Sequence, residues 1–340
     1  MAIKRVGSQT VKLLNPPAIV SAASIVGPKE GQGPLSNYFD KVLEDDLFGE
    51  DSWEKAESKM LKEAVRMAVS RQDLMLPDID YMLGGDLLNQ LMSSSFAARD
   101  LQIPFLGLYG ACSTMAESLS LSAMLVDGGF ADRCIATTSS HFSTAERQFR
   151  FPLELGNQRP LTSQWTVTGA GAALVANDDG GPFITYITTG KVIDYGIIDA
   201  NNMGAAMAPA AADTIGRHFD DTGMLPEDYD LIITGDLGRY GRDIASDLLK
   251  TKGYEVVKNF TDCGIEIFNP KKQDTHAGGS GCGCSAVVFC GYLFKLLREH
   301  RLNKIMLIST GALFSPTSAQ QGESIPSIAH AVTIESKKKN

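Results

Sequence analysis

Apolar and polar positions along the chain fall into blocks that recur in a fixed order. In residues 58–72, apolar side chains return at intervals of three and four, which is typical of one buried face of a helix. A short turn that contains proline follows, and then an apolar run at 81–83 that ends in glycine. A short apolar run between turn residues is typical of a buried strand. This stretch is therefore predicted to form a helix, a tight turn and a strand.

The same order of blocks occurs again in the second half of the chain. "LPDIDYMLGGDL" (76–87) is matched by "LPEDYDLIITGDL" (225–237), and each follows a helical pattern. Residues 110–140 are matched by 281–311, and both segments read as a small-residue entry, a long apolar helix, a polar turn and a strand. Self-similarity over several consecutive elements is typical of a duplicated architecture. Chance similarity between common βα patterns is the alternative.

A strand-like run closes each half, at 168–177 and at 327–336. We therefore expect two halves related by pseudo-twofold symmetry, residues 1–195 and 196–340. The boundary is expected near 192–202. The first half carries the Cys112 loop and the second carries His276.

Strands that alternate with helices predict an α/β fold with largely parallel sheets. The long helices of both repeats are apolar on most faces, so they are expected to be buried between sheets instead of lying on the surface.

Composition and charge exclude some classes of partner. The 340 residues carry a net charge of −9, and the pI is about 5.1. Nucleic acid is therefore not expected as a partner, because phosphate binding needs clustered Lys and Arg. The chain has no secretory signal pattern and no apolar run near the ~18 residues of a membrane span. If the protein works at a membrane, we expect it to be peripheral and held there by another protein.

The six cysteines are scattered among apolar runs and form no CxxC pair. Cys282 and Cys284 form a CxC at a predicted helix start. A zinc site needs four ligands at a recognisable spacing, so no metal site is expected. Reduced, buried thiols are the favoured interpretation.

Cys112 stands apart because it follows a small-residue turn and opens a predicted helix, in "GLYGACSTMAES" (107–118). A helix N-terminus offers unpaired N–H donors and a partial positive charge, which lower the pKa of a thiol and attract anions. A cysteine at such a junction is more often a packed thiol than a nucleophile. Its small neighbours leave room for a ligand, however, and His276 precedes a glycine-rich turn into the matching helix. Both interpretations stay open at this point.

Two motifs carry a resemblance to a known family. "GACSTMAES" (110–118) resembles the nucleophile loop of thiolases and ketoacyl synthases. "HAGGSG" (276–281) resembles the thiolase-type motif whose histidine faces that cysteine. The resemblance covers nearly the whole chain. It implies the five-layered thiolase-like fold, which is built from two duplicated halves with sheets around buried helices.

Two departures from the family pattern concern the chemistry. Gly235 and Asp236 stand where condensing enzymes carry a second catalytic His or Asn, and Thr310 and Gly311 stand where thiolases carry another cysteine. Condensation needs an activated thiolate and a group that stabilises an oxyanion. We therefore expect no catalytic residue, with Cys112 and His276 as vestigial candidates. The alternatives are an active acyltransferase or thioesterase that uses Cys112 and His276, and a scaffold with a vestigial pocket.

Longer strings, among them "TTSSHFSTAERQFRFPLELGNQRP" (137–160), resemble a branch of this family that acts in spore formation. The resemblance implies a protein that binds dipicolinic acid (pyridine-2,6-dicarboxylate), free or as its Ca²⁺ chelate, during uptake into the forespore and release at germination. It also implies a peripheral location at the spore inner membrane, with membrane proteins of the same operon as partners. No resident cofactor is expected, and calcium would enter only with the ligand.

A planar dianion needs hydrogen-bond donors, positive potential and a slot for its ring. The residues expected to supply these lie at the start of the Cys112 helix, at strand ends or in the motifs above: Cys112, Ser113, Thr114, Ser139, Ser140, His141, Arg147, Asp236, His276 and Gly311. Arg150 and Arg239 are further candidates.

Each of these residues also has a structural alternative. Ser139 and Ser140 could simply end a strand, the arginines could lie at the surface or in a dimer interface, and Asp236 could cap the following helix, which is the commoner use of such a residue. The apolar centre of an expected edge strand at about 132–138 is compatible with a homodimer formed through that strand. The alternative is a monomer in which "FPLELG" (151–156) covers the strand.

Overall fold

The computed structural model describes residues 3–149, 159–256 and 258–338. Its strands are β1 (Thr10–Lys12), β2 (Ala18–Val26), β3 (Lys41–Val42), β4 (Tyr81–Gly85), β5 (Phe105–Gly107), β6 (Arg133–Ser140), β7 (Trp165–Thr166), β8 (Gly169–Ala176), β9 (Phe183–Thr188), β10 (Leu231–Thr234), β11 (Phe260–Asp262), β12 (Gly279–Ser280), β13 (Lys304–Ala312) and β14 (Ser327–Glu335). Its α-helices are α1 (Trp53–Ser70), α2 (Met92–Leu101), α3 (Thr114–Asp127), α4 (Phe142–Phe149), α5 (Met203–Thr222), α6 (Gly238–Thr251), α7 (Cys263–Ile267), α8 (Cys282–Val287), α9 (Phe294–Arg298) and α10 (Pro316–Gln320). Two short turns matter below, the 3-10 turn η5 (Ala111–Ser113) and the π-helical turn η8 (Val288–Leu293) between α8 and α9.

The strand order confirms the duplication. The large mixed sheet runs β11-β10-β13-β14-β9-β2-β8-β6-β4-β5, so that two sets of five strands stand in mirrored order. The set that holds the strands of the second half also includes β9, which precedes residue 195. The two sets meet where β2 pairs with β9, at the single register Ala18 with Phe183. In this order β9 takes the place in the second set that β2 takes in the first. The division of the chain near residue 195 stays a prediction.

Equivalent polar contacts recur in both halves. Asp80 precedes β4 and accepts from the backbone N–H groups of Asp132 and Arg133 at 2.7 and 2.9 Å. Asp230 precedes β10 and accepts from the N–H groups of Asn303 and Lys304 at 2.5 and 3.1 Å. Each aspartate thus connects the loop before one strand, β4 or β10, to the start of the neighbouring strand in the sheet, β6 or β13.

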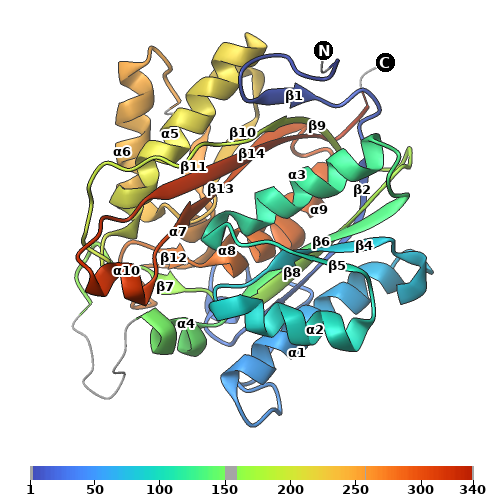
Figure 1. Cartoon of the computed structure of the whole chain (residues 1–340), viewed down its shortest axis with the longest axis horizontal. Coiled ribbons are helices and arrows are strands. Elements are labelled where there is room, and N and C mark those ends of the chain that lie inside the picture. The colour runs from blue at the N-terminus through green and yellow to red at the C-terminus, as the bar shows by residue number, and fades with distance from the viewer. Residues whose placement is uncertain (1–2, 150–158, 257, 339–340) are drawn as a thin grey trace.

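The helices divide the molecule into five layers (Figure 1). Helices α1 and α2 cover the outer face of the first strand set, and α5 and α6 cover the outer face of the second. Between the two sets lie α3 and the α8-η8-α9 helix, as their apolar sequences predicted. Strand β2 is buried along its whole length and carries no polar face, because helices pack on both sides of it.

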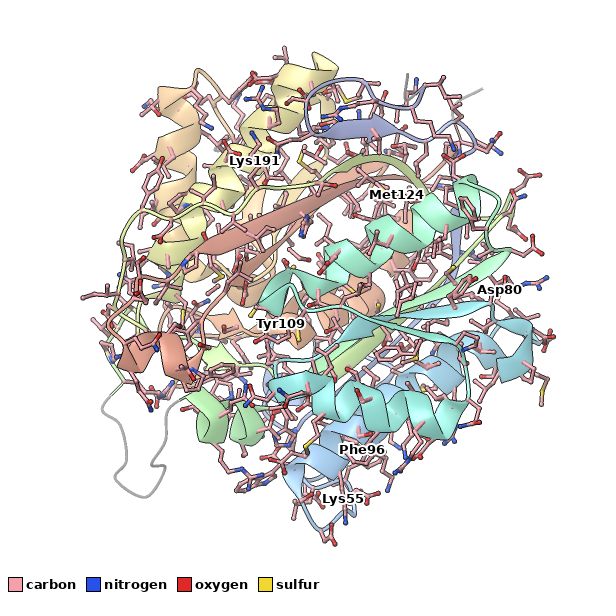
Figure 2. All side chains as sticks on the ribbon, viewed as in Figure 1. Lys55, Asp80, Phe96, Tyr109, Met124 and Lys191 are labelled. Carbon is pink, nitrogen blue, oxygen red and sulfur yellow. The ribbon has the colours of Figure 1, made fainter. Side chains whose placement is uncertain are left out.

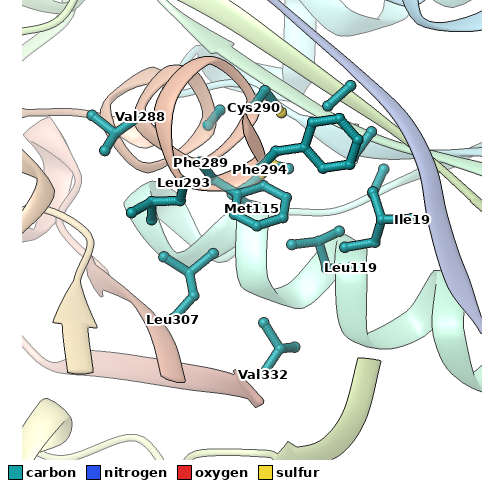
Figure 3. Packing of buried hydrophobic residues seen from close by; sticks show 14 of the residues in the cluster. Ile19, Met115, Leu119, Val288, Phe289, Cys290, Leu293, Phe294, Leu307 and Val332 are labelled. Carbon is teal, nitrogen blue, oxygen red and sulfur yellow. The ribbon is translucent and has the colours of Figure 1, made fainter. Parts of the chain in front are cut away.

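The central layer holds the two halves together. Figure 3 shows part of it, where fully buried side chains of α3, η8, β13 and β14 meet: Met115, Leu119, Phe289, Leu293, Leu307 and Val332. Since burying one such side chain contributes about 1.5–3 kcal/mol, this cluster supplies a large favourable term to folding. Among the helices of the described ranges, none has the length and the apolar run needed to cross a bilayer.

The strand expected to form a dimer edge is an interior strand. β6 pairs with β4 on one side and with β8 on the other, and all of its residues except Arg133 are buried. The expectation of an edge at 132–138 is therefore wrong. In the described part of the sheet, the strands at the two ends are β5 and β11.

Candidate ligand site

Cys112 lies in η5, at a sharp turn between β5 and α3. The residue before it, Ala111, has a left-handed backbone conformation with φ of 49°. This conformation is unfavourable for a residue other than glycine, and it persists only where the surrounding structure holds the residue in place. The elbow that the small-residue sequence predicted is therefore present.

Strand β13 runs directly against this elbow, which explains the glycine at position 311. A Cβ atom on Gly311 would lie 2.1 Å from the carbonyl oxygen of Gly110. The close approach needs a residue without a side chain. Gly311 thus has a packing role, and its expected contact with a ligand stays a prediction.

The thiol of Cys112 lies beside the buried carboxylate of Asp236, and each group affects the protonation of the other. Asp236 follows β10, in the other half of the chain. The Asp236 carboxylate accepts from the Thr310 hydroxyl at 2.7 Å, the Gly281 N–H at 3.0 Å and the Ser280 hydroxyl at 3.2 Å. Two of these donors come from the glycine-rich turn and one from β13. Asp236 and Thr310, which stand at positions where the sequence departs from the condensing-enzyme pattern, thus belong to one hydrogen-bonded cluster.

Burial and charge set the protonation of this cluster. Burial raises the pKa of Asp236 to about 6, although its hydrogen bonds act in the opposite direction. Burial and the nearby negative charge of Asp236 raise the pKa of the Cys112 thiol well above its ordinary value. The helix start was expected to lower the pKa of Cys112, but burial and the charge of Asp236 raise it by more. At neutral pH the thiol keeps its proton, and a thiol is a far weaker nucleophile than a thiolate.

A cavity of about 70 Å³ opens beside Cys112. It is lined mainly by apolar and aromatic side chains, among them Leu87, Tyr109, Ala111, Ala145, Phe149, Met203, Met207, Ala312 and Phe314. Its polar lining consists of Cys112, Glu146, Thr166 and Ser280, and none of the described residues that line it is Lys or Arg.

A larger outer pocket of about 490 Å³ shares Tyr109 and Phe314 with this cavity. Figure 2 shows Tyr109 beside the chain that leads into α3. The inner cavity is smaller than the ~300 Å³ at which small-molecule sites usually begin. The two aromatic side chains therefore stand between a narrow inner cavity and a roomier outer pocket.

Further carboxyl groups lie near the inner end of the cavity. Glu57 of α1 accepts from the hydroxyls of Thr144 and Ser139 at 2.8 and 3.2 Å. Burial, together with the adjacent Asp86, raises the pKa of Glu57 to about 8. Burial also raises the pKa of Asp86, whose carboxylate accepts from the N–H groups of Leu88 and Ser94 at 2.8 and 2.7 Å.

Several expected ligand residues instead use their side chains for local hydrogen bonds. The Ser113 and Thr114 hydroxyls donate to the carbonyls of Gly110 and Ala111, both at 2.7 Å. The Ser140 hydroxyl donates to the carbonyl of Val167 at 2.7 Å. With the Ser139 contact to Glu57 given above, all four side chains are buried and satisfied within the protein.

His141 follows β6 as expected, but its ring does not line the cavity. Its Nε2 lies 2.8 Å from the carbonyl oxygen of Asp46, and its Nδ1 accepts from the N–H of Ser143 at 3.1 Å. A ring that donates with one nitrogen and accepts with the other is neutral. Burial also lowers the pKa of His141. Its position fits a structural role.

Neither Arg147 nor Arg239 lines the Cys112 cavity. Arg147 forms an ion pair with Glu54 and lies over the ring of Trp53. It lines a separate groove of about 960 Å³ between α1, α2 and α4, where most of the lining residues are polar or charged. Arg239 is exposed in the first turn of α6. Arg150 lies outside the described residues.

His276 does not face Cys112, which corrects the expectation drawn from the motif. Its Nδ1 lies 2.8 Å from the carbonyl oxygen of Pro160, and its Nε2 lies 2.9 Å from the carboxylate of Asp274. Asp236 occupies the position beside the thiol instead. The motif identified the correct loop, but the direction of the His276 side chain depends on contacts with a distant segment.

Asp236 does not cap the helix that follows it. The N–H groups of Leu237 and Gly238, at the start of α6, are bound by the carboxylate of Asp262 at 2.7 and 3.0 Å. Burial raises the pKa of Asp262 to about 7.

The sequence analysis missed most of the apolar lining, namely Tyr109, Phe149, Met203, Met207 and Phe314. Two of these residues lie at the start of α5, whose helical pattern resembles that of any buried helix. No local signal distinguishes a methionine that lines a cavity from one in a packed core.

Comparison with known proteins identifies relatives over the full length. The model of the family described as "Stage V sporulation protein AD (SpoVAD)" matches residues 7–335. The stage V sporulation protein AD of Bacillus subtilis (strain 168) is 50% identical over 333 residues, which cover 98% of each chain.

Solved structures with low sequence identity share the fold. The 3-oxoacyl-(acyl carrier protein) synthase III, FabH, of Pseudomonas aeruginosa PAO1 superposes with a TM-score of 0.56 at 13% identity, covering 96% of this chain and 99% of that one. An OleA variant from Xanthomonas campestris bound with cerulenin gives a TM-score of 0.59 at 14% identity, covering 94% and 96%. The five-layered, thiolase-like α/β fold expected from the sequence is therefore confirmed.

Proposed function

Because the chain belongs to the stage V sporulation protein AD family, we propose that it binds dipicolinic acid for uptake into the forespore and release at germination, and that it does so without catalysis. Family membership supports a role in sporulation. The proposal adds a ligand, a site and a mode of action to that role.

The single observation that carries a binding function is the position of the Asp236 carboxylate beside the Cys112 thiol. A condensing enzyme needs a thiolate beside donors that stabilise a developing oxyanion. Here a carboxylate lies beside a protonated thiol, and it would repel both a thiolate and an oxyanion. The cavity is thus suited to holding a molecule and unsuited to acyl transfer.

The cavity wall favours an uncharged form of the ligand. A dianion placed among the described lining residues, which are mainly apolar and include no Lys or Arg, would lose its hydration without gaining an opposite charge from them. In the calcium chelate, the two carboxylates of dipicolinate are balanced by one Ca²⁺, so that the net charge is zero. We therefore propose that the Cys112 cavity takes the calcium chelate, with the metal as part of the cargo.

The ligand would use both the inner cavity and the outer pocket. A ring with two carboxylates does not fit 70 Å³, so Tyr109 and Phe314 have to turn aside for the chelate to enter. Side-chain rotation of two aromatic residues at a pocket boundary is a small rearrangement for ligand binding.

We further propose a peripheral location at the spore inner membrane. In this arrangement the other stage V sporulation A-operon membrane proteins would hold the chain, and the ligand would pass between them and the cavity.

Calorimetric titration with calcium dipicolinate tests the function. The decisive variant is Ala312→Leu, which fills the cavity from the end of β13. Ala319→Leu on the exposed face of α10 is the matched control. We expect saturable binding to the unmodified chain and to the control, and at least tenfold weaker binding to Ala312→Leu.

The Cys112→Ala variant separates this proposal from the acyltransferase alternative. A binding protein keeps its affinity for the chelate when the thiol is removed. Transfer or hydrolysis of an acyl thioester that disappears in Cys112→Ala, together with no binding of the chelate, would overturn the proposal.

A further inference from the structure

The turn between β4 and α2 contains two successive residues with a left-handed backbone. Gln90 has φ of 56° and ψ of 26°, and Leu91 has φ of 52° and ψ of 50°. Neither residue is glycine, so each is held in a conformation that an L-amino acid rarely adopts. Such conformations persist only where neighbouring groups impose them, and they are concentrated in ligand clamps and switch regions. The contacts of this turn therefore have to account for its shape.

Leu91 is held by a notch between two paired strands, β4 and β5. A Cβ atom on Gly107 of β5 would lie 2.8 Å from Cδ1 of Leu91, and a Cβ atom on Gly85 of β4 would lie 3.1 Å from its Cδ2. A side chain at either position would therefore crowd the leucine. The two methyl groups of Leu91 fill the space that these residues leave, which is called the glycine notch below.

Hydrogen bonds from side chains hold the first part of the turn. The carboxylate of Asp86 accepts from the N–H of Leu88 at 2.8 Å. The side-chain amide of Gln148, on α4, accepts from the N–H of Asn89 at 3.1 Å and donates to the carbonyl of Leu87 at 2.9 Å. The first part of the turn is thus fixed by two polar side chains, and the last part is seated in the glycine notch.

The same turn borders the inner cavity, the outer pocket and the groove described above. Leu87 lines the inner cavity, and Leu88 lines the groove of about 960 Å³. Asn89 and Gln90 line both that groove and the outer pocket of about 490 Å³, and Leu91 lines the outer pocket. A movement of the turn would therefore change the outer pocket and the inner cavity together.

We propose that the turn of residues 87–91 is a gate for the Cys112 cavity and that Leu91 is its latch. In the closed form, which the structure shows, Leu91 occupies the glycine notch and Gln90 is held left-handed. When Leu91 leaves the notch, both residues return to common backbone conformations and the turn withdraws from the outer pocket. The molecule that the gate admits rests on the proposed function: it is dipicolinate, which does not fit a cavity of about 70 Å³.

Two opposing contributions keep the closed and open forms close in free energy. The left-handed residues disfavour the closed form, whereas the burial of the Leu91 methyl groups favours it. A ligand shifts such an equilibrium when it binds one form better than the other. Because dipicolinate needs the open form to pass the outer pocket, the rate at which it enters follows the population of that form.

Alkylation of Cys112 by iodoacetamide tests the gate without any ligand, since the reagent has to reach a half-buried thiol through the cavity. Leu91→Ala empties the glycine notch and should make alkylation about fivefold faster. Gln90→Gly should make it about threefold slower, because glycine adopts a left-handed backbone readily and stabilises the closed form. Gln102→Gly is the matched control and should leave the rate unchanged, since Gln102 is exposed and has φ of 57° and ψ of 28° at the other end of α2.

Mass spectrometry of the Cys112 and Cys290 peptides across pH separates gating from other effects. A gate changes the Cys112 rate by one factor at every pH, whereas an altered pKa of the thiol moves the midpoint of the profile. A general loss of stability would also expose Cys290, which is buried. The gate is excluded if Leu91→Ala and Gln90→Gly act in the same direction, if the midpoint or the Cys290 rate accounts for the change, or if Gln102→Gly acts like Gln90→Gly.

Surface plasmon resonance with calcium dipicolinate then measures entry of the proposed ligand. Association should be faster for Leu91→Ala and slower for Gln90→Gly, by the same factors as alkylation. Opposite effects on alkylation without any binding of the chelate would uphold the gate and overturn the proposed ligand. Binding of the chelate with equal alkylation rates in all variants would overturn the gate and leave the proposed function standing.

Discussion

The Cys112 thiol and the Asp236 carboxylate come from different halves of the chain and lie side by side at the elbow that precedes α3. Their pairing replaces the arrangement in which a cysteine at a helix start is activated by the helix and by a base. A carboxylate next to the sulfur stabilises the protonated thiol, because a thiolate there would face a like charge. The same fold can thus keep a cysteine at the elbow and favour its protonated form.

Asp236→Asn should make Cys112 more reactive. Loss of the negative charge lowers the pKa of the thiol and increases the thiolate fraction, roughly tenfold for each unit of pKa. Alkylation by iodoacetamide, followed by mass spectrometry of the Cys112 peptide across pH, measures this. Asp243→Asn, on exposed α6 surface, is the control. Equal alkylation rates in all three proteins would show that Asp236 does not govern the thiol.

The buried carboxyl groups should make the protein less stable as pH rises. Glu57 keeps its proton in the folded chain up to a pKa of about 8, whereas an unfolded glutamate loses it near pH 4.5. The folded state binds more protons between these values, so its stability is fully present below about pH 4.5 and is lost as pH rises through about 8. The slope is about 1.4 kcal/mol per pH unit for each proton.

Glu57→Gln tests this directly, since glutamine resembles the protonated carboxyl. Urea unfolding at a series of pH values should give a flatter pH dependence for Glu57→Gln between about pH 6 and 8. Glu63→Gln, at a half-exposed position on the same helix, should follow the unmodified protein. Parallel curves for all three would mean that Glu57 titrates normally.

Gly311→Ala should destabilise the fold. The new Cβ would meet the carbonyl oxygen of Gly110 at 2.1 Å, so β13 and the elbow would have to separate. We expect a loss of about 2–4 kcal/mol, as for other substitutions that force a backbone shift in a core. Thermal unfolding measures it against Gly180→Ala, an exposed position where the nearest atom would be 3.2 Å away. Similar melting temperatures for the two variants would contradict the packing role.

A homodimer, if it forms, should use the exposed edge of β5. Exposed apolar side chains gather near this strand, with Leu106 45%, Phe96 47% and Tyr109 47% accessible, and Figure 2 shows Phe96 on α2. An open strand edge with apolar neighbours is a ready surface for pairing. Leu106→Lys should therefore yield a monomer in sedimentation velocity, whereas Leu225→Lys, at an exposed site elsewhere, should not. A dimer that persists in Leu106→Lys would locate the interface elsewhere.

The fold could be predicted well from the sequence because its helices and strands recur in the same order in two similar segments. The β4 and β10 segments share their turn, strand and glycine-aspartate exit, and the structure preserves these down to matching hydrogen bonds at Asp80 and Asp230. The burial of a strand or helix is predicted from many of its residues together. One residue that departs from the hydrophobic pattern therefore does not change the prediction.

The site was harder to predict because the direction of one side chain depends on distant partners. His141 lies at the expected strand end, yet its ring turns to the carbonyl of Asp46. His276 lies in the expected loop, yet Asp274 and Pro160 hold it away from Cys112. The sequence allows Asp236 to cap the helix that follows it, but in the structure Asp262 has that role. None of these partners can be read from the neighbouring sequence.

Asp86 and Asp236 occupy the same place in the two halves, yet they differ in what the fold demands of them. Asp86 holds its own loop through the N–H groups of Leu88 and Ser94. In the second half, Asp262 holds the corresponding helix start. Asp236 instead joins the glycine-rich turn, through Ser280 and Gly281, to Thr310 of β13. Equivalent aspartates of a duplicated architecture can thus serve a local loop in one copy and a contact between distant segments in the other.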